Sequence, residues 1–258
     1  MQRNIVLTLL LWLSCQLSAQ SQLEWQTLAP MPIAVQEIYP AVHNGMIYVA
    51  GGLSDALPES AQQMTDAVQL YNPASNSWQL APALPEPRHH AYLVSVANQL
   101  FLFGGFVIAD GGRWSASNDV LLLDEQSQQW RNVAKLPKPL TETVAVVLND
   151  KVHLASGRSP VAETNAQWRD QADVNWHWVF DPQNLTVTEA APLPLAFNSA
   201  SGVVLNGQFY VVGGRQVGGA NLAQLQRAMQ LAGSFAQWQE LAGEHDRISG
   251  AEQWREDE

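Results

Sequence analysis

An element that recurs four times along this chain limits the folds open to it. Each copy is a short apolar run that ends in two small residues, Gly-Gly in three copies and Ser-Gly in one. The copies occupy residues 46–52, 100–105, 152–157 and 209–214. They follow one another at steps of roughly 52 to 57 residues, and self-similarity at such a period is typical of repeated supersecondary units. The chain is therefore predicted to repeat one structural unit.

Each unit is predicted to contain four short strands. A turn precedes every apolar run: Asn44-Gly45, Asn98-Gln99, Asn149-Asp150 and Asn206-Gly207. Asn-Gly between apolar runs is a strong hairpin signal, because both residues tolerate positive φ. Third strands are expected at 67–70, 120–123, 176–180 and 228–231, and fourth strands at 78–82, 130–134, 185–192 and 238–242. A further fourth-strand pattern, at 25–30, leads the chain with no strands before it.

Together these residues resemble the kelch repeat, whose units fold as blades of a β-propeller. The resemblance rests on the paired glycines, on the spaced tryptophans, and on Tyr71-Asn72-Pro73 and Phe180-Asp181-Pro182 after third strands. It implies an all-β, kelch-type propeller over residues 20–250, where the alternative is an unrelated all-β sandwich. Four blades are recognisable, with a leading closure strand and a C-terminal stub at 245–250, before a charged tail at 251–258.

Kelch rings usually have more blades, so the ring is predicted to be a shortened one or an open arc. An open arc leaves strand edges and apolar blade faces unpaired, which favours self-association.

The first residues have the pattern of a secretory signal peptide, predicted at 1–19. Arg3 supplies the positive start, residues 5–13 are almost all apolar, and Leu17-Ser18-Ala19 offers small residues for cleavage. The apolar run is short for a bilayer span, so no transmembrane segment is expected. A periplasmic or secreted protein is predicted. A retained anchor and a lipoprotein modified at Cys15 are the less favoured alternatives.

Charge and cysteine content exclude several classes of function. The chain has 13 basic and 24 acidic residues, a formal charge of −11, with no Lys/Arg-rich block, so a nucleic-acid partner is not expected. Cys15 is the only cysteine. Once the signal peptide is removed, no disulfide and no cysteine metal ligand remain.

Alignment of the repeats on their glycines predicts a ligand site. Propeller ligands commonly bind at one mouth of the channel, on the loops that lead into the innermost strands. Three aligned columns fall there: Glu37, His90, Glu142 and Ser199; Gln36, His89, Thr141 and Asn198; Leu53, Phe106, Arg158 and Arg215. In peptide-binding kelch domains the matching columns carry arginines, serines and asparagines that hold an acidic ligand.

The resemblance therefore nominates Arg158 and Arg215 for binding, with His89, His90, Asn198 and Ser199 beside them. Glu37 and Glu142 depart from the family pattern and would repel an acidic ligand, which favours a neutral or zwitterionic one such as a sugar. The alternative is a set of solvated mouth residues with no ligand.

Two loops are predicted between second and third strands, at 109–118 and 159–175, and each carries a tryptophan beside an arginine. Trp114 and Trp168 are candidates for stacking on a sugar ring, or else they wedge between blades. Wedging is the favoured interpretation for Trp176 and Trp178.

The predicted function is therefore binding, of a glycan or of another envelope protein. The alternative is a sugar mutarotase of the sialic-acid epimerase type, in which Glu37, Glu142, His90 and Arg215 would act. A copper oxidase of the galactose-oxidase type is excluded, because its site needs a cysteine. No cofactor motif is present. No metal site is expected, because His89 and His90 are adjacent strand residues that should point to opposite faces.

Overall fold

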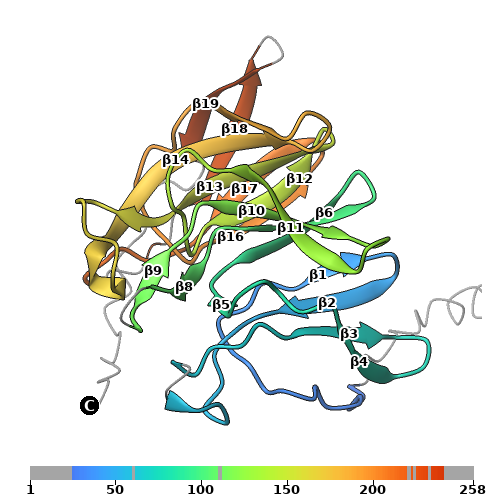
Figure 1. Cartoon of the computed structure of the whole chain (residues 1–258). Coiled ribbons are helices and arrows are strands. Elements are labelled where there is room, and N and C mark those ends of the chain that lie inside the picture. Colours follow the sequence, from blue (N-terminus) through green and yellow to red (C-terminus); the bar gives the residue numbers. More distant parts are fainter. Residues whose placement is uncertain are drawn as a thin grey trace, which may run out of the picture.

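The computed structural model describes residues 25–59, 62–109, 112–219, 222, 225–231 and 234–240, and this part of the chain is almost entirely β-structure. Figure 1 shows four antiparallel sheets that follow one another in chain order, from blue to red. We call these sheets blades 1 to 4. The signal peptide, the C-terminal stub and the charged tail predicted from the sequence lie outside the described residues.

The blades have the following strands. Blade 1 contains β1 (Ala41–His43), β2 (Met46–Ala50), β3 (Val68–Asn72) and β4 (Ser77–Ala81). Blade 2 contains β6 (Tyr92–Val96), β7 (Gln99–Phe103), β10 (Asp119–Asp124) and β11 (Gln129–Lys135). Blade 3 contains β12 (Val144–Leu148), β13 (Lys151–Pro160), β14 (Gln171–Asp181) and β15 (Thr186–Glu189). Blade 4 contains β16 (Ser201–Leu205), β17 (Gln208–Val212), β18 (Leu225–Leu231) and β19 (Ser234–Glu240).

The hairpin turns before the second strands lie close to where the sequence predicts them. Asn44 and Gly45 both have positive φ, as do the Asn-Asp and Asn-Gly pairs of blades 3 and 4. In blade 2 the turn is one residue earlier than predicted. Ala97 and Asn98 carry the positive φ values (50° and 58°), and Gln99 already belongs to β7. The strand register, set by the apolar face, decides which residues turn.

The hydrophobic core is divided into three parts, one between each pair of successive blades. Leu93 and Leu102 belong to the part between blades 1 and 2, Phe101 and Phe180 to that between blades 2 and 3, and Phe209 to that between blades 3 and 4. Blades 2 and 3 therefore bury apolar side chains on both faces, and a blade is stable only beside its neighbours.

Blade 4 presents a free apolar face among the described residues. Val203 and Leu205 of β16 are 52% and 57% exposed, whereas their counterparts Val146 and Leu148 in β12 are 9% and 5% exposed because blade 4 covers them. No described sheet packs against β16 on this side, so the described blades form an open arc. Self-association through this face stays a prediction.

The paired glycines allow adjacent blades to approach through their backbones. The N–H of Gly105, at the end of β7, donates to the carbonyl of Leu140 at 2.9 Å, and Gly52 and Gly157 make the same bond to Arg88 and Phe197. The second position is glycine in all four repeats, whereas Ser156 takes the first position in blade 3. A side chain at the second position would meet the segment that leads into the first strand of the same blade.

We expect Gly105→Ala to lower the free energy of unfolding by about 2–4 kcal/mol, from overpacking and from a left-handed backbone. Its φ is +87°, and a Cβ there would lie 2.6 Å from the Cβ of Ala91 and 2.7 Å from the carbonyl of His89. Gly45→Ala is the control, because Gly45 also has positive φ (+75°) but nothing lies within 4 Å of its Cβ position. Urea unfolding compares the two, and equal losses would contradict the close-approach explanation.

The leading strand predicted at 25–30 is not a strand in the structure. Ala29 instead donates its N–H to Asn76 Oδ1 and accepts from Trp78 Nε1, both at 2.8 Å. The indole of Trp130 makes the equivalent contact with the carbonyl of Pro82 at 2.9 Å. The segment thus occupies the place of a fourth strand preceding blade 1. It pairs with no described sheet, because the three strands that would complete that blade are not among the described residues.

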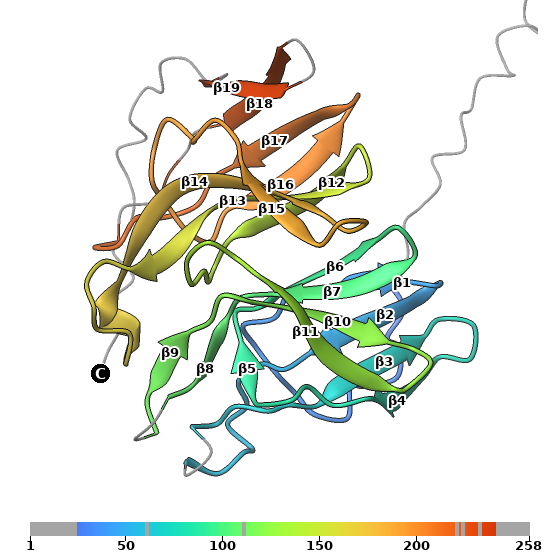
Figure 2. The same cartoon turned by 45° about the horizontal axis from the view of Figure 1, so that its top comes forward.

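The two predicted loops between second and third strands are largely ordered β-structure. In blade 2 this segment forms β8 (Phe106–Ile108) and β9 (Trp114–Ala116), which pair with β5 (Arg88–His89) in a small sheet. In blade 3, β13 and β14 extend beyond the blade and are joined through a short 3₁₀ helix, η2 (Trp168–Asp170). The two extensions lie side by side in Figures 1 and 2, where the Asn165 side chain bonds both backbone groups of Ala116 at 2.8 Å.

Candidate functional site

The predicted column of mouth residues is brought together by the fold. Glu37, His90, Glu142 and Ser199 stand at equivalent turns into their blades, and all four have positive φ between 51° and 59°. Neighbouring members are linked through the backbone: the N–H of His90 donates to the carbonyl of Glu37 at 3.0 Å, and that of Ser199 to Glu142 at 3.1 Å. The alignment on glycines thus predicted correctly which residues share this layer.

Glu142 is the centre of the polar cluster at this mouth. Its carboxylate is fully buried and accepts from Arg158 Nη1 at 3.2 Å, from the Ser199 hydroxyl at 2.8 Å and from Arg215 Nη2 at 3.4 Å. Arg158 is 1% exposed, but the side chain of Arg215 is 50% exposed. Of the two predicted arginines, only Arg215 is open to a ligand, because Arg158 neutralises a buried carboxylate.

Asp173 belongs to this cluster, although the sequence analysis did not select it. Its carboxylate accepts from Asn198 Nδ2 and from the N–H of Val217, both at 2.6 Å. The Asn198 oxygen in turn accepts from Arg215 Nε at 3.1 Å. Asp173 holds Asn198 and, through it, the exposed arginine. Only its place in a long segment between two strands could have drawn attention to it.

Glu37, His90 and His89 form a second polar group. His90 Nε2 lies 2.7 Å from the Glu37 carboxylate, and the Nδ1 atoms of His90 and His89 are 2.5 Å apart. The hydrogen bond from His90 lowers the pKa of Glu37. Burial, with a smaller contribution from His90, lowers the pKa of His89 to about 2, so His89 is neutral.

The prediction that His89 and His90 point to opposite faces was therefore wrong. The strand β5 ends at His89, and the positive φ of His90 (52°) breaks the alternation on which that prediction depended. The two rings contact each other. Even so, the described residues contain no group of three or more His, Cys, Asp or Glu side chains that could hold a metal ion.

Tyr39, which was not selected from the sequence, lies near the carboxylates of Glu142 and Glu37. Its ring stacks on Tyr92 with centroids 4.4 Å apart. Burial raises the pKa of the Tyr39 hydroxyl, and the charges of Glu142 and Glu37 add to this effect. Tyr39 therefore stays protonated.

The two tryptophans nominated for ligand stacking have different environments. Trp168 is 45% exposed, and its ring covers the guanidinium of Arg158 at 4.0 Å. Trp114 packs edge-on against His89, with centroids 4.3 Å apart, and contacts Phe106. Only Trp168 presents much of its surface to solvent. The wedge interpretation holds for Trp178, which is 3% exposed in the core between blades 2 and 3.

A run of buried polar atoms beside this cluster has no partner among the described protein atoms. These atoms are His89 Nε2, Trp114 Nε1, Thr141 Oγ1, Arg158 Nε and Gln171 Oε1. Their residues are joined by contacts: Gln171 bonds Asn165, which bonds Ala116 on the strand of Trp114, and Arg158 bonds the Gln171 carbonyl. Buried polar groups are nearly always satisfied, so each of these atoms calls for a polar partner such as an ordered water molecule.

Four-stranded antiparallel sheets that pack face to face around a common mouth define the protein as a β-propeller of the kelch type. The model of the KLHDC2/KLHL20/DRC7 Kelch-repeats domain matches residues 18–253, and the chain belongs to this kelch-repeat family. Within the described residues no helix has the length and apolar character needed to cross a membrane.

Known proteins resemble the chain over most of its length. It is 24% identical to Kelch-like protein terF of Aspergillus terreus, over 72% of this chain and 40% of that protein. It is 27% identical to Beta-scruin of Limulus polyphemus, over 74% of this chain and 20% of that protein. The chain thus spans two fifths or less of these relatives. The solved structure of YjhT has the same fold, with a TM-score of 0.66 and 18% identity over 83% of this chain and 67% of that one.

Proposed function

We propose that this chain is an exported binding protein that holds a neutral or zwitterionic polar ligand, a glycan, at the mouth of its kelch blades. The observation that carries the proposal is the polar cluster around Glu142, at whose edge Arg215 and Trp168 are exposed. A sugar offers many hydroxyl groups that both donate and accept, which matches a mixed set of donors and acceptors. Export rests on the signal-peptide pattern of residues 1–19.

The charge of the site supports a neutral ligand over an acidic one. Glu142 already forms ion pairs with Arg158 and with one nitrogen of Arg215. Glu37 lies across the mouth, and its side chain is 43% exposed. An acidic ligand would meet this carboxylate beside an arginine that already pairs with Glu142. A segment of an envelope protein with exposed hydroxyl or amide groups is the other ligand that suits these contacts.

Sugar mutarotation is the second candidate, and the Glu37–His90–His89 chain of contacts favours it, because linked groups of this kind can move protons. Two features favour binding instead. Both oxygens of Glu142 accept hydrogen bonds from cations or a hydroxyl, and the lowered pKa of Glu37 makes it a weak base. We therefore expect the protein to leave the rate of N-acetylneuraminate anomer exchange, followed by NMR, unchanged.

We expect Arg215→Ala and Trp168→Ala each to weaken binding at the mouth by about tenfold or more, because each removes an exposed contact. Calorimetric titration with glucose, galactose, N-acetylglucosamine and N-acetylneuraminate measures the affinity. Arg131→Ala and Trp25→Ala are the matched controls, since Arg131 is an exposed arginine paired with Asp124 on the outer strand and Trp25 is fully exposed. Equal binding by all four variants, or no binding of any probe, would contradict the proposed function.

A further inference from the structure

Blade 3 departs from the repeat at one position on its third strand. On the second strand of each blade, the residue just before the two small residues pairs with one residue of the third strand. That partner is Val68 in blade 1, Val120 in blade 2 and His177 in blade 3. The residue that precedes each of these partners is Ala67, Asp119 and Trp176. Asn118 and Asn175, one position earlier, confirm the alignment, because each donates a side-chain N–H to a backbone carbonyl after the fourth strand of its blade. Asn118 donates to Leu136 at 3.1 Å, and Asn175 donates to Leu193 at 2.9 Å.

In blade 2 this position is filled by charge pairs. Asp119 bonds Arg88 at 3.3 Å, Lys135 at 3.0 Å and the Ser117 hydroxyl at 2.9 Å. Burial opposes ionisation, but the bonds from Lys135 and Ser117 outweigh it and lower the pKa of Asp119 to about 2. The equivalent of Arg88 in the next repeat is Leu140, which cannot pair with a carboxylate. Blade 3 therefore lacks this network and carries an indole in its place.

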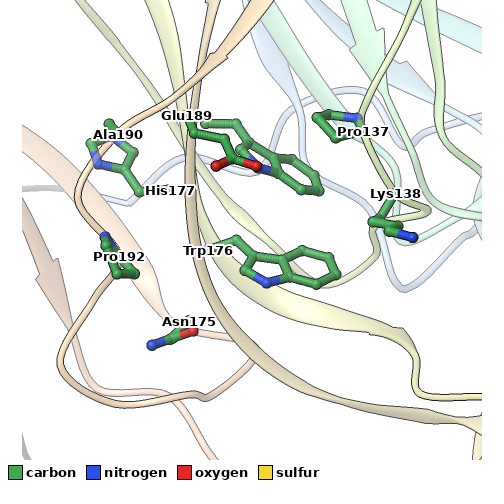
Figure 3. Close-up of a pocket in the computed structure, with 9 residues that line it drawn as sticks. Pro137, Lys138, Asn175, Trp176, His177, Glu189, Ala190 and Pro192 are labelled. Carbon is green, nitrogen blue, oxygen red and sulfur yellow. The ribbon is translucent and has the colours of Figure 1, made fainter.

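The structure has an open crevice at Trp176. Its volume is about 400 Å³, within the range of sites that hold small molecules. Figure 3 shows the Trp176 ring in the middle, with Lys138 on one side and Pro192 on the other. Glu189 pairs with Trp178 across neighbouring strands and lines the same crevice. Trp176 is half-buried against the core between blades 2 and 3 and stacks on Trp178 with centroids 4.9 Å apart, so a buried residue fixes the orientation of its ring.

The two charged groups of the crevice are available to a ligand. Lys138 and Glu189 make no ion pair with any described residue, and both are exposed. Their charges cancel, so the crevice attracts neither anions nor cations as a class. An aromatic face, a donor and an acceptor match a ligand with an apolar C–H face and hydroxyls at its rim.

We propose that the crevice at Trp176, between blades 2 and 3, binds one neutral pyranose unit, with its C–H face against the indole and its hydroxyls on Lys138 and Glu189. This site is separate from the mouth and does not depend on the function proposed there. A chain with two saccharide contacts gains affinity for a longer glycan, because the second contact forms at a high effective concentration.

The test is a titration of the ¹⁵N-labelled protein with methyl β-glucopyranoside, methyl β-galactopyranoside and N-acetylglucosamine, in which the indole N–H signal of Trp176 is followed by NMR. We expect at least one glycoside to shift this signal. The affinity should fall about tenfold in Trp176→Phe, which has a smaller ring, and by a similar factor in a Lys138→Met/Glu189→Gln variant. For Trp176→Phe, which lacks the indole, the affinity is taken from the backbone N–H signals of the crevice residues. Lys138 and Glu189 are exposed, so the second variant tests the site without risk to folding.

Arg215→Ala serves as the control, because it removes a mouth contact and should leave the affinity at Trp176 unchanged. Loss of the shift in Arg215→Ala would show that the signal reports the mouth and would overturn the crevice site. The proposal is also overturned if no glycoside moves the Trp176 signal, if the Lys138→Met/Glu189→Gln variant binds as the wild type does, or if a proline-rich peptide moves the signal where glycosides do not.

Discussion

Glu142→Gln is expected to lower the free energy of unfolding by about 3–5 kcal/mol, because it leaves the buried charge of Arg158 without a counter-ion. Both side chains are at most 1% exposed and bond each other at 3.2 Å, so neither can turn to solvent for compensation. Such a loss is a large part of the stability of an ordinary domain. Urea unfolding followed by tryptophan fluorescence measures the change.

Two further variants separate the buried charge from other effects. Glu86→Gln is the control, since Glu86 also bonds an arginine at 3.0 Å but is 44% exposed, and we expect a change below about 1 kcal/mol. Adding Arg158→Met to Glu142→Gln should recover part of the loss, because the unpaired charge is then gone. If the double variant is as unstable as the sum of the two single variants, the loss does not arise from the ion pair.

The protein is expected to lose stability as the pH falls below about 6.5, because it buries neutral histidines. His153 Nδ1 and His177 Nε2 lie 3.0 Å apart between blades 3 and 4, and both rings are 1% exposed. Burial lowers the pKa of His153 to about 4, with a further contribution from Lys151. Burial, and then the charge of His153, lowers the pKa of His177 to about 3.

The direction of this pH dependence follows from the protonation of the histidines in the folded and the unfolded chain. The unfolded histidines take up protons near pH 6.5, whereas the folded ones stay neutral to about pH 4 and pH 3, so protons favour the unfolded chain between these limits. The stabilisation from the neutral histidines is complete above pH 6.5. Below that pH, each histidine should lower the free energy of unfolding by roughly 1.4 kcal/mol per pH unit. Urea unfolding at pH 7.5 and pH 5 measures this slope.

A variant with glutamine at both positions tests the assignment to this pair. It should be less stable than the wild type at pH 7.5, because glutamine packs less well, but it should lose less stability between pH 7.5 and pH 5. An unchanged pH dependence would place the effect in other groups. Asp119 does not interfere, because its contribution is lost only between its ordinary pKa of 3.8 and its folded pKa of about 2, below the range measured.

Much of the candidate site could be predicted from the repeat. Once the paired glycines were aligned, Glu37, His90, Glu142 and Ser199 fell into one column, and the structure places them at equivalent turns with the same left-handed backbone. Repetition makes this possible, because equivalent residues of identical units must occupy equivalent positions around a common axis.

The partners of those side chains could not be predicted in the same way. Arg158 and Arg215 stand in one column, yet one is buried against Glu142 and the other is half exposed, because only Arg158 is covered by Trp168. The contact between His89 and His90 depends on a single positive φ after β5. Such details arise from backbone conformation and from neighbouring blades, which a one-dimensional pattern does not contain.

By itself, the sequence determined the architecture of this protein: four antiparallel blades, their order, three of their four hairpin turns and the residues that share one layer at the mouth. These features follow from local periodicity and from glycines whose backbone approach no other residue allows as well. Only the tertiary structure decided which charges are neutralised, which tryptophans meet solvent, and that the segment at 25–30 lies beside blade 1 without joining a described sheet. The reason is physical: burial and pairing depend on the residues that approach from other blades, as in the contact between Glu142 and Arg215, which lie 73 positions apart.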